Sequence, residues 1–152
     1  MSAEETTQED ATEQELTYWQ RKLTEFDENV FSTPWYSTGN GRKTAFLIGV
    51  LMQRTKYQCK ENFGTVHPVK RMQAILKVQK NEGKLAAILR LCEAELLKVE
   101  SSQKRKSKYF GKQVDGPLRG RIYEALREQG SDLSDADTVL SFYDGYQYFL
   151  GV

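Results

Sequence analysis

The sequence is poor in the residues that most often carry catalysis or cross-linking. Its 152 residues include one histidine, two cysteines and three prolines. Cys59 and Cys92 lie in otherwise helical patterns, and no second pair completes a metal knuckle, so we expect two buried, reduced thiols. The longest apolar run, residues 45–52, is far shorter than the roughly 20 residues of a membrane span, and the acidic first residues have no signal-peptide character. We therefore expect a soluble, cytoplasmic protein with no membrane partner.

Motifs for catalysis or cofactor binding are also missing. His67 precedes Pro68 in an expected turn, and no serine, cysteine or carboxylate pattern around it suggests a nucleophile or a general base. Residues 38–44, TGNGRKT, miss the spacing of a phosphate-binding loop. Arg42 and Lys43 could still hold a phosphate at a helix N-terminus, although a flexible turn with a positive tail explains them at least as well. The sequence thus predicts no enzymatic activity, no cofactor and no metal site.

Apolar residues recur at three- and four-residue steps along most of the chain, and no alternating pattern indicates a strand. Residues 1–12 are acidic and poor in apolar side chains, and we expect them to be a disordered leader. The helix expected over residues 44–59 is apolar nearly all round in its first half, which places it at the centre of a bundle, and Gly49 would permit close approach of a neighbour. Helices are predicted to begin near Glu13, Thr44, Pro68, Leu85, Pro117 and Ser134. We expect an all-α fold, with residues 13–152 forming a single compact bundle of five or six helices.

The formal net charge of +1 conceals a strong segregation of charge. Residues 1–30 carry 2 Lys or Arg and 9 Asp or Glu, whereas residues 42–112 carry 17 and 5. Residues 113–152 are acidic again, with 3 Lys or Arg and 7 Asp or Glu. A basic block of this size attracts polyanions when it folds into one surface, and nucleic acid is the commonest such partner. The charge pattern therefore predicts a nucleic-acid-binding protein.

A row of lysines is the first candidate contact surface. At about 100° per residue, an unbroken helix from Pro68 would bring four lysines to one side. These are Lys70, Lys77, Lys80 and Lys84. The solvated face of an ordinary amphipathic helix has the same pattern. Because Glu82 is the only acidic residue within 62–92, however, the row has few carboxylate partners, which favours an external anion.

The second candidate is a basic and aromatic segment that follows residue 103. Tyr109 and Phe110 could stack on bases while the cations around them hold the backbone, or they could simply anchor a loop to the core. The cations are Lys104, Arg105, Lys106, Lys108 and Lys112. Three arginines of the next helix lie in an acidic neighbourhood and are expected to be paired within the fold. They are Arg119, Arg121 and Arg127.

Parts of the chain resemble a known family. The similarity lies in the segments AFLIGVLMQ (45–53), VHPVKRMQAIL (66–76) and LSDADTVLSFYDGYQYFLGV (133–152). In pattern and order they look like the C-terminal helical portion of large subunits in type I CRISPR effector complexes, of the I-B and I-D kind. In several subtypes that portion is also made separately as a small subunit. The resemblance covers roughly residues 43–152, and the acidic first 30 residues have no counterpart in it.

This resemblance implies a small subunit of a Cascade complex, acting in antiviral defence. Such subunits are helical bundles without catalysis that stack in several copies along the inner face of the complex. They contact the large subunit and the backbone subunits, and they help to hold guide RNA, target DNA and the displaced DNA strand. Because base pairing reads the sequence in such a complex, backbone contacts by lysine suffice. Acidic and basic regions could also attract neighbouring copies head to tail.

Another function fits the same charges. A protein–protein adaptor could use its basic face to bind an acidic partner. Nucleic-acid binding with a steep salt dependence would separate the two functions. An enzyme is the remaining class, and it would need acidic or histidine residues gathered in a cleft.

Overall fold

The computed structural model describes residues 17–37, 41–65, 67–78, 80–104, 116–130 and 132–148, without the side chains of residues 103 and 104. A helix over residues 17–25 continues into the π-helix η1, Phe26–Val30. The helices that follow are α2 (Pro34–Ser37), α3 (Arg42–Phe63), α4 (His67–Leu76), α5 (Lys84–Lys104), α6 (Gly116–Gln129) and α7 (Ala136–Tyr148). The expected leader, residues 1–12, lies outside the described residues.

The all-α fold is confirmed, since the described residues contain helices and no strand. They form seven labelled helices rather than the five or six expected. Because η1 continues the first predicted helix, the additional helix is α2, whose four residues are too few to show a helical period in the sequence. No helix in the described part of the chain is long and apolar enough to cross a membrane.

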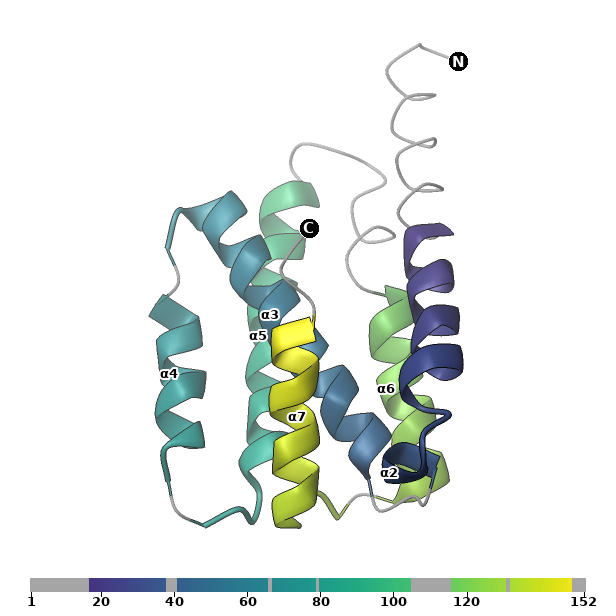
Figure 1. Ribbon diagram of the computed structural model, residues 1–152. Helices are drawn as coiled ribbons and strands as arrows, with labels where there is room; N and C mark the ends of the chain where they lie inside the picture. The colour runs from purple at the N-terminus through teal and green to yellow at the C-terminus, as the bar shows by residue number, and fades with distance from the viewer. Residues whose placement is uncertain are drawn as a thin grey trace.

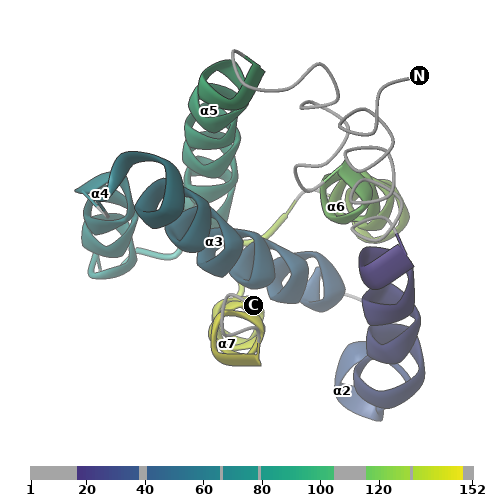
Figure 2. The same ribbon diagram turned by 90° about the horizontal axis from the view of Figure 1, so that it is seen from above.

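Helix α3 runs through the middle of the molecule (Figure 1). Seen from above, α7 lies on one side of α3 and α5 on the other, while α4 and α6 lie near its two ends (Figure 2). The apolar run predicted to be central is covered on all sides, and Phe46, Leu47 and Val50 expose 1% of their surface or less. The helix is bounded by Gly41 and Gly64, which both have left-handed backbone conformations. The prediction that this helix forms the centre of the core is therefore confirmed.

Two glycines allow α3 and α7 to lie in direct contact. A Cβ atom built on Gly49 of α3 would lie 2.7 Å from the Tyr146 nitrogen of α7 and closer still to the Phe142 carbonyl oxygen. Gly145 of α7 faces the backbone of Phe46 in the same way. Only a residue without a side chain lets two backbones approach so closely. The close approach expected at Gly49 is confirmed, and α7 is the neighbour.

Aromatic rings fix the N-terminal helix and α2 to the beginning of α3. Phe26 and Phe31 pack edge-on against Phe46, with ring centroids 5.2 and 5.3 Å away. The Tyr36 ring of α2 also packs edge-on against Phe46, with the ring centroids 5.7 Å apart. Trp19 is fully buried on the same N-terminal helix. Edge-to-face pairs add to the free energy gained by burial alone, so this end of the core is held mainly by aromatic packing.

Helix α5 presents the apolar stripe that the sequence predicts. Five of its side chains are fully buried: Leu85, Ile88, Cys92, Leu96 and Val99. Helix α4 packs on this stripe through Met72, whose sulfur lies 3.7 Å from the Cys92 sulfur. Cys59 and Cys92 are both buried and free, as expected.

The connection between α6 and α7 differs from the prediction at one residue. Gly130, with φ of 85°, ends α6 as expected. The cap of α7, however, is Asp135, whose Oδ1 accepts a hydrogen bond from the Asp137 backbone N–H at 2.8 Å. Ser134 instead donates its N–H and its hydroxyl to Asp132 Oδ1. The capping box predicted at Ser134 is wrong because an aspartate one residue later reaches the first turn of the helix.

Candidate nucleic-acid interface

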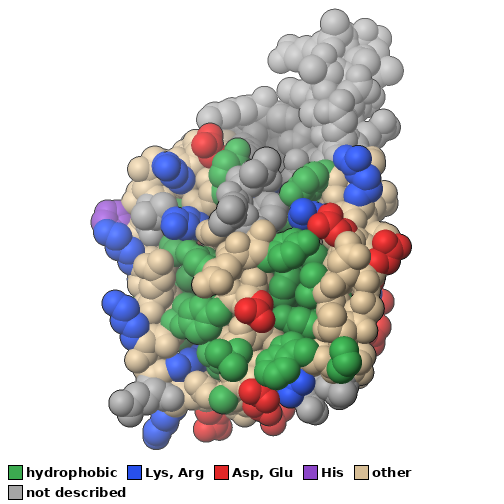
Figure 3. Space-filling view, viewed as in Figure 1, with side chains coloured by type: hydrophobic (Ala, Val, Ile, Leu, Met, Phe, Trp, Pro, Cys, Tyr) green, Lys and Arg blue, Asp and Glu red, His purple; other side chains and the backbone are tan. Residues whose placement is uncertain are grey.

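Charged side chains are unevenly distributed on the face of the molecule shown in Figure 3. Lys and Arg side chains lie along the edge formed by α4, whereas Asp and Glu side chains lie mainly toward the N-terminal helix and the lower end of the molecule (Figure 3). We define the α4 surface as the exposed side chains of Lys70, Arg71, Lys77 and Lys80. None of these four forms an ion pair with another residue that the structure describes. The α4 surface is therefore a group of cations that no ion pair compensates within the part of the chain that the structure describes.

The lysines do not lie on one continuous helix. Helix α4 ends at Leu76, and the next two residues form a turn in which the Lys77 nitrogen donates to the Ala74 carbonyl at 3.2 Å. Gly83, with φ of 76°, then precedes the start of α5. Lys70 thus lies on the helix, Lys77 in the turn and Lys80 in the connection. The predicted unbroken stripe is wrong, although these three side chains are all exposed.

Lys84 does not belong to the contact surface. It exposes only 7% of its surface, and its Nζ donates a hydrogen bond to the Leu76 carbonyl oxygen at 3.2 Å. The ammonium thereby satisfies a carbonyl at the C-terminus of α4, where a positive charge also complements the helix dipole. The predicted nucleic-acid contact of Lys84 is corrected to a structural role, because the charge is buried and already bonded.

Arg42 and Lys43 also have partners within the fold. The Arg42 guanidinium stacks on the Trp35 ring at 4.1 Å, donates to the Trp35 carbonyl at 2.7 Å and pairs with Asp137 at 3.2 Å. Lys43 lies 3.7 Å from a carboxylate oxygen of Glu128. These contacts fasten the beginning of α3 to α2, α6 and α7. The phosphate contact predicted at this helix start stays a prediction, and here both cations face carboxylates of the fold.

The second sequence candidate remains a prediction. Lys104 is the last residue of α5, and its side chain is not described. The other four cations of that segment, Arg105, Lys106, Lys108 and Lys112, lie outside the described residues.

The arginines of α6 follow the prediction in two cases of three. Arg119 pairs with Glu93 of α5 at 2.9 Å, and Arg121 pairs with Asp27 of η1. These pairs connect α6 to α5 and to η1. Arg127 is exposed and forms no ion pair with another described residue.

The sequence reasoning missed cations at the end of α3. Lys60 is exposed, Lys56 is half-buried, and Tyr57 between them exposes 37% of its surface. Arg54, one turn earlier, stacks on the Tyr57 ring at 5.2 Å. The signal that could have found them was the loss of the apolar run after Met52, which marks where the helix stops being enclosed.

Two titratable groups have strongly shifted pKa values. Burial raises the pKa of Tyr36 to about 12 and the pKa of the Cys59 thiol to about 11. Both groups stay protonated at neutral pH, so neither is the anion that nucleophilic catalysis needs. His67 is exposed at the start of α4. Among the described residues, no group of His, Cys, Asp or Glu side chains could hold a metal ion.

No family model, curated protein or solved structure matches the chain.

Proposed function

We propose that this chain is a non-catalytic, nucleic-acid-binding small subunit of a CRISPR Cascade effector complex. In this proposal the α4 surface contacts the phosphate backbone of guide RNA or target DNA. The observation that carries the proposal is the α4 surface itself, four exposed cations without an ion pair to another described residue. Cations left unpaired on one surface raise the local potential and attract a polyanion.

The kind of cation supports contacts to the backbone. Three of the four side chains are lysines, and a lysine ammonium neutralises phosphate as a compact point charge. Reading of bases relies instead on planar, bidentate groups of arginine, asparagine or glutamine. A complex in which a guide strand pairs with its target needs only backbone contacts from the protein. The α4 surface is suited to that task.

The proposal includes further partners and the finer architecture. They are the CRISPR large subunit, the backbone subunits and other copies of this chain, in the cytoplasm. The segregated charge supports contact between copies, because the basic edge of one molecule attracts the acidic region of the next (Figure 3). The packing of α5, α6 and α7 around α3 supports a single bundle over residues 13–152 (Figure 2).

Binding to two unrelated oligonucleotide sequences at several salt concentrations tests the proposal. Fluorescence anisotropy gives the affinity and the slope of log affinity against log salt. The double variant Lys77→Glu/Lys80→Glu should weaken binding to both sequences alike, and the slope should fall by roughly 0.7 to 0.9 for each phosphate that the variant no longer neutralises. The melting temperature should stay nearly unchanged, because both side chains are exposed.

A matched control separates the α4 surface from net charge. The double variant Arg21→Glu/Arg127→Glu makes the same change in charge at two exposed cations outside the α4 surface. It should lower the affinity much less than Lys77→Glu/Lys80→Glu. An equal decrease in affinity in the two double variants, or wild-type affinity and slope in Lys77→Glu/Lys80→Glu, would contradict the proposal.

The adaptor function remains the alternative. It is supported by the same uncompensated cations, because an acidic protein would also neutralise them. Absence of oligonucleotide binding at low salt, together with binding of an acidic protein domain, would favour it. Hydrolysis of nucleic acid or nucleotide that survives rigorous purification and disappears on replacing one acidic residue would overturn the non-catalytic part of the proposal.

A further inference from the structure

Two aromatic side chains near the end of α3 are exposed, and a lysine lies between them. Tyr57 exposes 37% of its surface and Phe63 exposes 41%. Lys60 is exposed as well, three residues from each of the two rings. Side chains three residues apart are neighbours on a helix surface, so the three form one row along α3. We refer to Tyr57, Lys60 and Phe63 as the α3 row.

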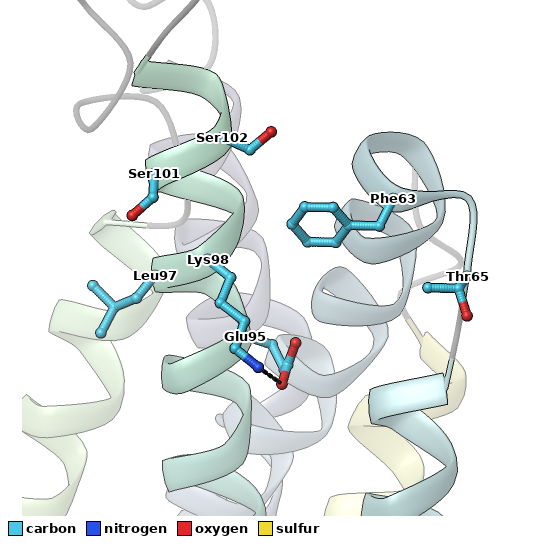
Figure 4. Close-up of a pocket in the computed structure, with 7 residues that line it drawn as sticks. All are labelled: Phe63, Thr65, Glu95, Leu97, Lys98, Ser101 and Ser102. Atoms are coloured by element: carbon cyan, nitrogen blue, oxygen red, sulfur yellow. Dashed lines mark hydrogen bonds and ion pairs between the residues drawn. The ribbon is translucent and has the colours of Figure 1, made fainter.

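The Phe63 ring extends from α3 into a pocket beside α5 (Figure 4). On the α5 side of this pocket, Glu95, Lys98 and Ser102 lie toward the ring, whereas Leu97 is turned to the other side of α5 (Figure 4). The pocket has a volume of about 600 Å³, which is within the range of sites for small organic groups. The exposed part of the Phe63 ring is therefore open to a flat group that enters between the two helices.

Polar groups opposite the ring suit a heterocycle. Glu95 is 7% exposed, and its carboxylate accepts a hydrogen bond from Lys98 Nζ at 3.1 Å. Because Lys98 already faces this buried charge, the pocket does not require a cation from a ligand. The remaining acceptor positions of the carboxylate and the Ser102 hydroxyl can bond N–H and carbonyl groups. A ring with a polar edge, such as a nucleobase, fits these surroundings better than an aliphatic chain.

The Tyr57 ring is supported from its buried side. The Arg54 guanidinium lies 5.2 Å from the ring centroid, and Arg54 exposes only 8% of its surface. Stacking of a guanidinium on a tyrosine ring is favourable and holds the ring in place. The part of the ring that faces solvent is thus held ready for a partner outside the fold.

The charge along the α3 row is mainly positive. Lys56 lies about one turn before Lys60, and neither lysine forms an ion pair with another residue of the described ranges. Glu61 is exposed beside Tyr57, but it lies about 200° around the helix from Phe63. A polyanion is therefore attracted to the part of the row formed by Lys60 and Phe63.

The α3 row ends close to the α4 surface. Phe63 and His67, the first residue of α4, are four residues apart, so their Cα atoms are separated by at most about 14 Å. Lys70 follows about one turn further along α4, with Arg71 next to it. A strand whose phosphates contact the α4 surface can therefore reach the row with its bases.

We propose that the α3 row binds unpaired bases of single-stranded nucleic acid. The rings of Tyr57 and Phe63 stack on bases, and Lys60 neutralises a phosphate of the same strand. Bases inside a duplex are stacked on one another, and extracting one costs free energy, so the row acts on single strands. This proposal rests on the proposed nucleic-acid binding and adds the kind of strand that is bound.

A strand without bases is the probe that isolates stacking. Fluorescence anisotropy compares the affinity of the full chain for oligothymidine of about 15 nucleotides with its affinity for an abasic strand of equal length and charge. The oligothymidine should bind at least about fivefold more tightly, because stacking of one base on an aromatic ring contributes that much or more. Oligouridine of the same length is the second arm, and the tighter of the two base-bearing strands identifies the occupant as DNA or RNA.

Tyr57→Ala/Phe63→Ala is the decisive variant. It should remove the preference for oligothymidine over the abasic strand and leave the salt slope unchanged, because it removes no cation. Tyr57→Phe/Phe63→Tyr keeps both rings and should keep the preference. Should the alanine variant fail to fold, Tyr57→Leu/Phe63→Leu repeats the test with apolar side chains that are not aromatic.

A matched control removes two exposed apolar side chains elsewhere. Leu140→Ala/Tyr143→Ala does so on α7, where the two residues expose 55% and 38% of their surface and the helix has no lysine or arginine. It should leave both affinities unchanged within about twofold. Lys60→Gln tests the phosphate contact, and it should lower the salt slope for single strands by roughly 0.7 while the preference for bases remains.

Several outcomes would overturn the proposal. One is equal affinity of the unaltered chain for the oligothymidine and the abasic strand. Another is an equal loss of preference in Tyr57→Ala/Phe63→Ala and in the control. Self-association that the alanine variant abolishes would assign the row to contact between copies. The variant Lys77→Glu/Lys80→Glu should weaken both strands alike and keep the preference between them, so failure of this proposal is distinguishable from failure of the α4-surface proposal.

Discussion

Replacing Gly49 by alanine tests the packing of α3 against α7. The new Cβ atom would lie 2.7 Å from the Tyr146 nitrogen, against 3.4 Å or more in ordinary contacts, and closer still to the Phe142 oxygen. Both atoms belong to the backbone, so no side-chain rotation relieves the clash, and the helices must separate by about 0.7 Å or more. Overpacking of this kind costs typically about 1–3 kcal/mol, and the upper end applies because a whole helix has to move.

Helix propensity acts in the opposite direction and sets the net effect. Alanine stabilises a helix interior by up to about 1 kcal/mol relative to glycine, which leaves a net loss of about 2 kcal/mol. For a chain of this length the melting temperature should fall by about 4–8 °C, measured by circular dichroism. Gly120→Ala is the control, because a Cβ atom there meets nothing within 4 Å. It should raise the melting temperature by about 2–4 °C. A Gly49→Ala protein that melts at or above the wild-type temperature would refute the close approach.

The remaining predictions concern the core, a helix end and a thiol. Leu51→Ala should cost about 2–5 kcal/mol in the free energy of unfolding, and Leu89→Ala should cost less within that range, because Leu51 is fully buried whereas Leu89 exposes 7% of its surface. Unchanged denaturation midpoints in both variants would show that the core lies elsewhere. Lys84→Met should lower stability by about 1 kcal/mol, since the Leu76 carbonyl loses its donor, and should leave oligonucleotide affinity unchanged. A decrease in oligonucleotide affinity equal to that of Lys77→Glu/Lys80→Glu would show that Lys84 does contact nucleic acid. Because burial raises the pKa of Cys59 from 9.0 to about 11, the folded thiol should resist alkylation near neutral pH and react once the chain unfolds. The unfolded thiol ionises first as pH rises, so this group's contribution to stability should be complete below pH 9.0 and decline toward about pH 11. Cys59→Ala should remove this part of the pH dependence, and identical pH profiles for the two proteins would contradict it.

The centre of the fold could be predicted because its signal is local. A run such as Phe46, Leu47 and Val50 is apolar on more than one helix face, and only a helix surrounded by others can bury it. The use of Gly49 could be predicted for the same reason, since a glycine within such a run has few roles other than close packing. Its partner Gly145 could not, because nothing local relates the two positions.

The candidate interface was harder to predict because it depends on where helices stop and on distant partners. Lys84 would share a helix face with Lys77 and Lys80 only if one helix ran without a break through all three residues. The helix instead ends before Gly83, so their spacing in the sequence does not place them on one face. Arg42 looked free to bind a phosphate because its partner Asp137 is 95 residues away in the sequence. The composition of a segment shows how many cations it has, whereas only the packed structure shows which of them remain uncompensated.

The packing of α3 against α7 has a consequence for synthesis on the ribosome. Arg42 at the start of α3 precedes its α7 partner Asp137 by 95 residues. At about 5–20 residues per second, the apolar run of α3 is synthesised about 5–20 s before the helix that covers it. During that interval residues 45–52 can bind a chaperone that recognises short apolar stretches. The arrival of α7 then competes with the chaperone for the same face of α3, so variants that weaken the crossing should lower the yield of newly made protein more than their loss of stability alone would suggest.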